Sequence, residues 1–314
     1  MTRFHRFFLV LAGWLCVLCL PQAHALNTIA NGFSWVENLC FDSKGNLFVS
    51  ENTHGEIWRI YRGETQYAME LMQDDFKSVL GMAYDPENDE IFAVVVRLDG
   101  RWRLPHNYLV GFKADYPGMY RIVAELSCAG NGLALHGGHA YITTAGTFLP
   151  GQAAVYRINL DTGIVGTFVN GLTHANGLAI DDATRQLYVG ELATGKVHVH
   201  DLRDGERLHS VQVLQPLHLE WLDDIVLDAG GQRLYGVDFA KGRVVSVDLN
   251  ARPDDELPIS VVLDDGVTNP TAIAWGRGPG FDSCSLYITE GGGITGLEHN
   301  RRVLELRGVR CGSP

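Results

Sequence analysis

The sequence predicts an all-β fold: a six-bladed β-propeller of four-stranded antiparallel blades, closed by an N-terminal strand. Three observations predict it. One short apolar pattern recurs six times, at intervals of 43, 51, 45, 47 and 48 residues. A turn rich in Asp, Gly and Asn and a second apolar strand follow each copy, and no repeat contains a convincing helical stretch. We call the first residue of each copy the lead residue; the six are Glu37, Leu80, Asn131, Asn176, Asp223 and Thr271.

Each repeat divides into four expected strands. The lead residue opens the first strand, in which small and large apolar residues alternate. Second strands are rich in aromatic and branched residues, which suit a pleated sheet, and lie at residues 47–49, 91–93, 140–142, 187–189, 234–236 and 286–288. Third strands follow after a short turn, as at residues 56–60, 154–158, 197–199 and 244–247. Fourth strands are weaker and more polar, as expected at the outer edge of a blade.

The start of the predicted domain resembles an outer strand. Residues 27–32 read NTIANG, and residues 166–171, before the fourth repeat, read GTFVNG. We therefore predict that residues 26–32 add an outer strand to the last blade and so lock the first and last blades together.

Residues 1–25 are predicted to be a secretory signal peptide. Arg3 and Arg6 precede an apolar run at residues 7–20, and the small-residue pattern AHA follows at residues 23–25. The run is too short to span a bilayer comfortably, and no later stretch approaches 18 apolar residues. Residues 26–314 are thus expected to form a single propeller domain that is exported, either to a periplasm or out of the cell. The alternative is an uncleaved signal that anchors the protein.

The charge balance narrows the expected partners. The chain has 25 Lys and Arg against 37 Asp and Glu, a net charge of −12, and loss of Arg3 and Arg6 with the signal makes it −14. So acidic a surface argues against nucleic acid and anionic membranes. A small-molecule partner is expected, and the oligomeric state stays open.

Four cysteines follow the predicted cleavage site: Cys40, Cys128, Cys284 and Cys311. Disulfides persist in exported proteins, but spacing alone does not give the pairing. We prefer Cys284 with Cys311, since both belong to the last repeat, and closing that loop stabilises by roughly 3 kcal/mol in the chain-entropy model. Cys40 occupies a small apolar position of the repeat and is predicted to be a buried free thiol.

The lead residues carry the predicted chemistry. If first strands line the central channel, these residues converge at one of its mouths. Glu37, Asn131, Asn176 and Asp223 would then supply carboxylate and amide oxygens, the ligand set of Ca²⁺ above all, or of another hard divalent cation. Zinc is disfavoured because no lead residue is His or Cys. As the alternative, Asn before Gly is an ordinary turn former, but that does not explain two carboxylates at the same register.

These segments resemble the senescence marker protein/gluconolactonase family of six-bladed propellers over about residues 27–308. HANGLAI at residues 174–180, LYVGEL at residues 187–192 and KVHV at residues 196–199 are also similar to a paraoxonase segment. Both families contain calcium-dependent hydrolases. The resemblance therefore implies a propeller that hydrolyses lactones or other esters and uses Ca²⁺ as its cofactor.

The resemblance implies roles for particular residues. Glu37, Asn176 and Asp223 match the metal ligands of the gluconolactonase type, and Asn131 matches a further Asn at the substrate or metal. Asn38 and Asp224, which follow two lead residues, match positions where paraoxonases add ligands or supports.

Two departures limit the resemblance. Ala129 stands where gluconolactonase-type sites often place an Arg for sugar hydroxyls, which argues against an aldonolactone substrate. The catalytic His pair of paraoxonases has no counterpart in this chain.

The expected mechanism is ester hydrolysis, with Ca²⁺ polarising the carbonyl at the channel mouth and Asp223 as the candidate catalytic residue that activates water. Ligation to the metal lowers the proton affinity of a carboxylate, so metal-bound water is an alternative base. Two other functions stay open. One is a non-catalytic propeller that serves as a binding module around a structural calcium. The other is a metal-free enzyme like strictosidine synthase.

Several polar residues near the predicted mouth are candidates for substrate contact. His174 and His218 lie in loops that lead to first strands, and His218 is the most plausible substitute base. Residues 97–107 form a long insertion that carries Arg101, and we expect either a lid or an exposed hairpin there. Acidic residues also recur at the ends of second strands, which is more typical of a repeated turn or inter-blade hydrogen bond than of a site; they are Glu51, Glu191, Asp238 and Glu290.

Overall fold

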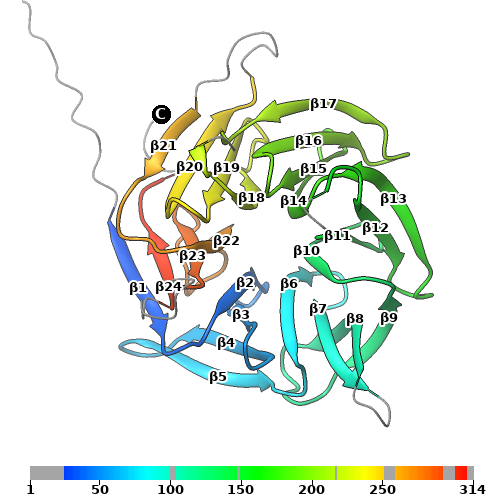
Figure 1. The fold of residues 1–314 in the computed structure, drawn as a ribbon. Helices are drawn as coiled ribbons and strands as arrows, with labels where there is room; N and C mark the ends of the chain where they lie inside the picture. The colour runs from blue at the N-terminus through cyan, green and yellow to red at the C-terminus, as the bar shows by residue number, and fades with distance from the viewer. Residues whose placement is uncertain are drawn as a thin grey trace, which may run out of the picture.

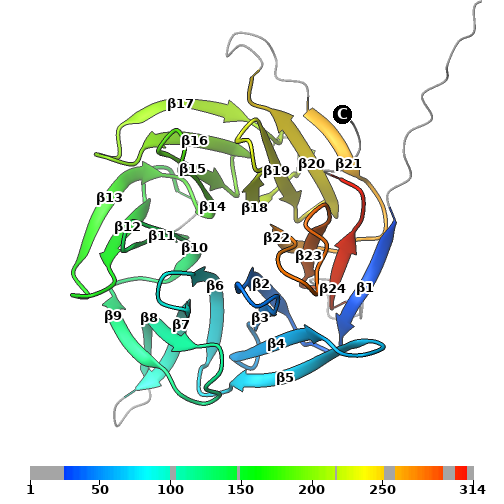
Figure 2. The ribbon, with the colours of Figure 1, turned by 180° about the vertical axis from the view of Figure 1, so that it is seen from behind.

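A computed structural model describes residues 25–99, 104–146, 149–215, 218–250, 259–292 and 301–309. Its strands form six four-stranded antiparallel sheets arranged around one axis, and Figures 1 and 2 show this ring from its two sides. The described residues contain no α-helix, and in particular none long and apolar enough to cross a membrane. The predicted six-bladed propeller is confirmed.

Each blade is built from consecutive strands, from the axis outwards. The innermost strands begin around the lead residues and are β2 (Val36–Phe41), β6 (Ser78–Asp85), β10 (Gly130–His136), β14 (Ala175–Asp181), β18 (Leu222–Leu227) and β22 (Pro270–Trp275). The second strands are β3 (Leu47–Glu51), β7 (Glu90–Asp99), β11 (His139–Thr144), β15 (Gln186–Glu191), β19 (Arg233–Asp238) and β23 (Leu286–Glu290).

The two outer layers complete the blades. The third strands are β4 (Glu56–Arg62), β8 (Leu104–Lys113), β12 (Ala153–Asn159), β16 (Lys196–Asp201), β20 (Arg243–Asp248) and β24 (Arg302–Leu306). The outermost strands are more exposed and are β5 (Tyr67–Gln73), β9 (Arg121–Leu126), β13 (Val165–Leu172), β17 (Arg207–Gln212), β21 (Ile259–Leu263) and β1 (Leu26–Asn31).

The N-terminal strand closes the ring. β1 pairs antiparallel with β24, with Leu26 opposite Leu306 and Asn31 opposite Arg302, so the last sheet has the order β1-β24-β23-β22. Figure 1 shows the blue β1 beside the red β24. The predicted outer strand is therefore confirmed, and both ends of the domain share one blade.

The hydrophobic core lies in the seams between blades. Six buried clusters each combine residues from two neighbouring blades. The aromatic residue of the second-strand repeat is buried in every blade, as Phe48, Phe92, Tyr141, Tyr188, Tyr235 and Tyr287. The repeat thus encodes one large wedge per seam, which explains why it recurs at blade spacing.

The cysteines agree with part of the prediction. Cys40 is buried and free, and burial raises the pKa of its thiol well above the usual range, so it is no nucleophile. Cys128 is also free, and Cys284 is disulfide-bonded. Because Cys311 lies outside the described residues, the pairing of Cys284 with Cys311 stays a prediction, as does the signal peptide at residues 1–25.

Candidate cation site at the propeller axis

A β-bulge lies at or beside the lead residue of every blade. In every blade the pairing between the first and second strands shifts register at or beside the lead residue. The shift brackets Glu37 in blade 1 and Asp223 in blade 5. A bulge leaves a residue unpaired and re-aims its side chain. The same backbone device therefore operates in all six blades, whatever the lead residue.

Asn131 and Asn176 lie inside strands. Both belong to innermost strands, so the interpretation of these Asn-Gly pairs as ordinary turns is wrong. The following glycines allow neighbouring blades to approach closely: a Cβ at Gly177 would lie 2.7 Å from the Cα of Asp224 in the next blade. These glycines therefore serve the spacing of the innermost strands.

Asn176 and Asp223 meet across the seam between blades 4 and 5. The Nδ2 of Asn176 donates a hydrogen bond to Oδ1 of Asp223, and both side chains are buried. Since the amide nitrogen is used in this way, the amide oxygen of Asn176 remains as an acceptor or ligand. Asn131 occupies the corresponding position in β10 and is half-buried.

Glu37 is held by two neighbours from its own blade. The indole Nε1 of Trp35 lies 2.5 Å from Oε2 of Glu37, and the Asn52 side chain also bonds to this carboxyl. Burial raises the pKa of Glu37 to about 7, although both hydrogen bonds lower it. One carboxyl oxygen is thus fixed by Trp35.

The axial carboxyl groups destabilise one another's charged forms. Burial raises the pKa of Asp223 well above its usual range, and the charges of Glu37 and Asp224 raise it further. Burial also raises the pKa of Asp224 to about 7, against backbone hydrogen bonds from Ile273 and Ile225. No lysine or arginine stands among the main influences on these three pKa values.

This donor set fits a hard divalent cation. Buried acids that repel one another, with no basic side chain of the described residues among the main influences on their pKa values, gain most from a bound positive charge. Their oxygens, with the amide oxygens of Asn176 and Asn131, are of the type that Ca²⁺ prefers. The carboxyl atoms of Glu37, Asp223 and Asp224 do not lie within 4.8 Å of one another as a group, so the amides are needed to complete a ligand set.

Asn38 and Asp224 brace the ring. Oδ1 of Asn38 accepts the backbone N–H of Met82 at 3.1 Å, and Oδ2 of Asp224 accepts that of Ile273, also at 3.1 Å. Each bond joins an innermost strand to that of the next blade, two residues beyond its lead residue. A direct role of either residue in cation binding stays a prediction.

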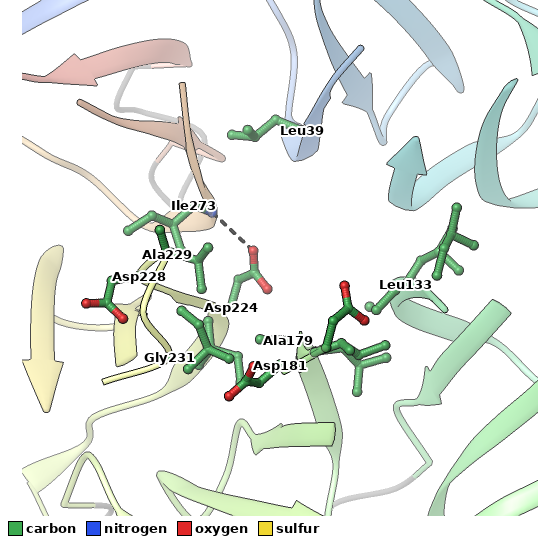
Figure 3. A pocket seen from close by; sticks show the side chains of 18 of the residues that line it. Leu39, Leu133, Ala179, Asp181, Asp224, Asp228, Ala229, Gly231 and Ile273 are labelled. Carbon is green, nitrogen blue, oxygen red and sulfur yellow. Dashed lines mark hydrogen bonds between the residues drawn. The ribbon is translucent and has the colours of Figure 1, made fainter. Parts of the chain in front are cut away.

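A cavity continues along the axis below the lead residues. It has a volume of about 660 Å³, and Figure 3 shows Asp224 facing it, with Asp181 and Asp228 at other points of its wall. Its wall also includes Asn38 and runs to the ends of the innermost strands, so it opens on the face opposite to the lead residues. Asn38 and Asp224 thus follow two lead residues and also lie on the wall of this lower cavity.

The two candidate histidines lie in different surroundings. His174 directly precedes β14, has a positive φ of 51°, and burial lowers the pKa of its imidazole. His218 has 69% of its side chain exposed, and its Nδ1 is 3.9 Å from Oε1 of Glu220. His174 is thus half-buried beside an innermost strand and His218 is largely exposed, and a catalytic role of either stays a prediction.

The long hairpin of blade 2 is bonded mainly to its own blade. The guanidinium of Arg97 lies 5.9 Å from the ring centre of Tyr108 and 5.6 Å from that of Tyr120, and His106 lies 2.8 Å from Glu125. In Figures 1 and 2, β7 and β8 lean toward the rim of the ring. These contacts favour the exposed-hairpin alternative over a lid; Arg101 lies outside the described residues.

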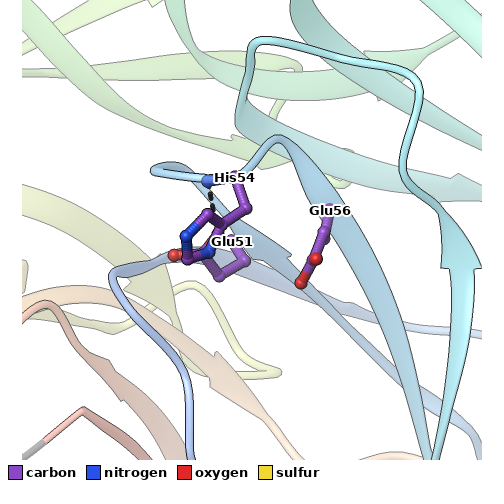
Figure 4. Close-up of side chains that lie close together, drawn as sticks. All are labelled: Glu51, His54 and Glu56. Carbon is purple, nitrogen blue, oxygen red and sulfur yellow. Dashed lines mark hydrogen bonds and ion pairs between the residues drawn. The ribbon is translucent and has the colours of Figure 1, made fainter.

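Among the described residues, a single group brings three ionisable ligand atoms within 4.8 Å of one another, and it includes none of the axial carboxyl groups: Glu51, His54 and Glu56 (Figure 4). Their oxygens already have partners. Glu51 accepts the backbone N–H groups of Trp35 and His54 at 2.6 and 2.7 Å, and Glu56 accepts the indole N–H of Trp58. Three other acids at the ends of second strands, Glu191, Asp238 and Glu290, likewise accept a backbone N–H. In each case the N–H belongs to a residue just before the innermost strand of the same blade. The predicted repeated turn is therefore confirmed.

Sequence reasoning missed the role of Trp35. A signal was present, because only the two acidic lead residues have a Trp two positions earlier: Trp35 before Glu37 and Trp221 before Asp223. The pattern was hidden because these residues precede the apolar repeat, in segments that otherwise differ between blades.

Comparison with solved structures gives matches over nearly the whole chain. A luciferin-regenerating enzyme aligns with a TM-score of 0.71 at 14% identity, over 91% of this chain and 96% of its own. Regucalcin from Agrobacterium tumefaciens, a calcium-binding protein, has a TM-score of 0.67 at 16% identity, over 90% and 93%. A gluconolactonase from Xanthomonas campestris has a TM-score of 0.65 at 18% identity, over 90% and 89%. At such low identities these likenesses establish the fold.

Comparison with curated proteins gives no match. The family model described as the SMP-30/gluconolactonase/LRE-like region matches residues 126–291, which include Asn131, Asn176 and Asp223 and more than half of the chain. The protein therefore belongs to the SMP-30/gluconolactonase/LRE-like family of β-propellers.

Proposed function

We propose that the protein is a calcium-dependent hydrolase of lactones or other carboxylic esters, with Glu37, Asn176 and Asp223 as the principal ligands and Asn131 as a further ligand or substrate contact. The single observation that carries the proposal is the set of buried, mutually repelling carboxyl groups at the axis beside the Asn176–Asp223 pair. A bound Ca²⁺ would polarise the ester carbonyl and offset the negative charge that develops on its oxygen.

Asp223 is the proposed base. The amide of Asn176 holds one of its oxygens in place. Metal-bound water is the alternative base, because ligation to the metal lowers the proton affinity of this carboxylate. As water attacks the carbonyl carbon, Asp223 takes a proton from it. The same proton then passes to the departing alcohol oxygen, so that a lactone and water give a hydroxy acid.

Two features support a lactone or ester with few hydroxyl groups over an aldonolactone. Ala129 offers no charged donor for hydroxyl groups, and Leu80 and Thr271 supply no ionisable group at two of the six lead positions. The gluconolactonase with the same fold makes lactone hydrolysis the natural reaction to test, and calcium binding by regucalcin makes Ca²⁺ the first cation to test.

The direct test is hydrolysis of a panel of lactones and aryl esters with Ca²⁺, after removal of Ca²⁺ by a chelator, and after its return. We expect activity to disappear with the chelator and to recover with Ca²⁺. Activity that is unchanged by a chelator would refute the metal-dependent scheme.

Substitution separates the role of Asp223 as base and ligand from the role of Asn131 as a further ligand or substrate contact. Asp223→Asn keeps the shape of the side chain but removes the base and a charged ligand, so kcat should fall at least about 100-fold. Asn131→Ala should cost much less. Equal losses in the two variants would argue against a special role for Asp223.

A further inference from the structure

Three aromatic rings lie side by side at the end of the axis where the lead residues lie. The ring centres of Trp35 and Phe239 are 6.1 Å apart at an interplanar angle of 35°, and those of Trp221 and Phe239 are 6.1 Å apart at 9°. Both tryptophans are partly exposed and Phe239 is buried between them. We call these three residues the aromatic arch.

The aromatic arch lies over blade 6. Trp35 comes from blade 1, and Trp221 and Phe239 come from blade 5, the two blades that flank it. A Cβ on Gly291, directly after β23 of blade 6, would lie 2.9 Å from Cζ2 of Trp35, so the indole packs on this backbone. Asn269 of blade 6 donates to the backbone oxygen of Phe239 at 2.8 Å. The aromatic arch therefore covers blade 6, whose lead residue is Thr271.

The aromatic arch touches the candidate cation site directly. The N–H edge of Trp35 points at Glu37, at 2.5 Å, while the same indole contacts Phe239. The backbone N–H groups of Trp35 and Trp221 are held by Glu51 and Asp238, at 2.6 and 3.0 Å. Both tryptophans are therefore anchored at the backbone, and a ligand beside Glu37 would lie next to the ring of Trp35.

Such a surface favours ligands that present a flat, apolar face. A hydroxyl group that points at the aromatic rings loses water without gaining a hydrogen bond. An aromatic group gains stacking worth about 0.5–1.5 kcal/mol in addition to the burial of its area. The structure therefore favours a planar, apolar group beside the axial carboxylates.

We propose that the aromatic arch binds an aromatic ring of the substrate, so that the ester group next to it lies at the axis. This inference rests on the proposed hydrolysis and specifies its substrate class. Trp221 contributes ring surface, and Trp35 joins that surface to Glu37.

The test compares δ-valerolactone with the same lactone bearing one phenyl group, both as substrates and as their non-hydrolysable lactam analogues. In the calcium-loaded protein, tryptophan fluorescence should report binding of the phenyl lactam at least about tenfold tighter than that of the unsubstituted lactam. Trp221→Leu should remove most of this preference and raise KM for the phenyl lactone alone.

A matched control is Trp275→Leu. Trp275 lies at the far end of β22, where its indole bonds to the backbone oxygen of Leu227. Its loss should leave the phenyl preference intact, which separates a local role of the aromatic arch from general destabilisation.

The outcomes distinguish the two proposals. Equal affinity of the wild-type protein for the two lactams, or an unchanged preference in Trp221→Leu, would overturn the role of the aromatic arch even if lactones are hydrolysed. If neither lactone is hydrolysed but the lactams are discriminated as expected, the proposed hydrolysis fails and the aromatic arch stands as a binding surface.

Discussion

At the scale of single residues, three carboxyl groups are buried together at the axis, where their charged forms are least stable. Glu37 and Asp224 each have a pKa of about 7, because burial disfavours their charged forms. Burial also raises the pKa of Asp223, and the charges of Glu37 and Asp224 raise it further. Ionisation of these groups destabilises the protein unless a cation is bound. The stability of the metal-free protein should therefore depend on pH.

These pKa values predict the direction of that sensitivity. In an unfolded chain the two groups titrate near 4, so between about pH 4 and pH 7 the folded state holds more protons. Their contribution to stability is complete below pH 4 and is lost as the pH rises through 7. Without a cation, the free energy of unfolding should fall from pH 5 to pH 8 by a few kcal/mol relative to Glu37→Gln.

Urea unfolding at pH 5 and pH 8, in a chelator and in Ca²⁺, measures this effect. Saturating Ca²⁺ should abolish the fall, since a bound cation offsets the charges that repel one another. An identical pH dependence in wild-type protein and in Glu37→Gln would contradict the assigned pKa of Glu37.

Trp35 provides a second prediction at the residue scale. Trp35→Phe keeps the ring but removes the N–H that fixes Oε2 of Glu37, so cation affinity should fall about tenfold or more. Calorimetric titration with Ca²⁺ measures this affinity without using the indole as a reporter. Trp275→Phe is the control, and an unchanged affinity in Trp35→Phe would contradict the role of this contact.

At the scale of strands, the site depends on bulges and on ties between blades. Thr143 in β11 is the clearest case: its Oγ1 accepts the N–H of Gly132 at 2.8 Å and donates to the backbone oxygen of Asn176 at 2.6 Å. Ser50 makes the equivalent pair of bonds between blades 1 and 2. Side-chain hydroxyls thus satisfy backbone groups that the bulges leave unpaired.

Thr143→Val tests this tie. It replaces a buried hydroxyl with a methyl group of similar size and leaves two backbone groups unpaired, so the free energy of unfolding should fall by about 1–3 kcal/mol. Cation affinity should also fall, because Asn176 loses its support. Thr167→Val, on the exposed strand β13, is the matched control. A loss no larger than that of the control in urea unfolding would show that the tie contributes little.

The strands were largely predictable and their bulges were not. The repeat located the first three strands because side-chain burial in a blade follows its apolar alternation. The shift at each lead residue depends on how two strands pair, which a single strand's pattern does not encode. For this reason the hydrogen bonds from the backbone of the next blade to Asn38 and Asp224 were not predictable from the sequence.

At the scale of the molecule, closure holds the lead residues together. The innermost strands contact one another around the whole ring, with β22 against β2, and β1 joins the two ends of the domain through β24. The similarity between residues 27–32 and an outer strand was enough to predict this closure. The contacts of the aromatic arch were not predictable, since they join loops from blades that are not consecutive in sequence.

Removal of residues 26–32 should open the ring. The truncation leaves β24 without its outer partner, so the midpoint of thermal unfolding should fall by about 10 °C or more. A chain that begins at residue 26 is the control and should match the full-length protein, because the preceding segment is proposed to be a removable export signal. Equal stability of the two shortened chains would contradict the role of β1.

The account as a whole depends on a cation at the axis. Calorimetric titration of the chelator-treated protein with Ca²⁺ tests it most directly, with Glu37→Gln and Asp223→Asn measured alongside. We expect saturable binding by the wild-type protein and an affinity lower by about tenfold or more in each variant. Absence of binding by the wild-type protein, or binding that both variants retain unchanged, would contradict the account.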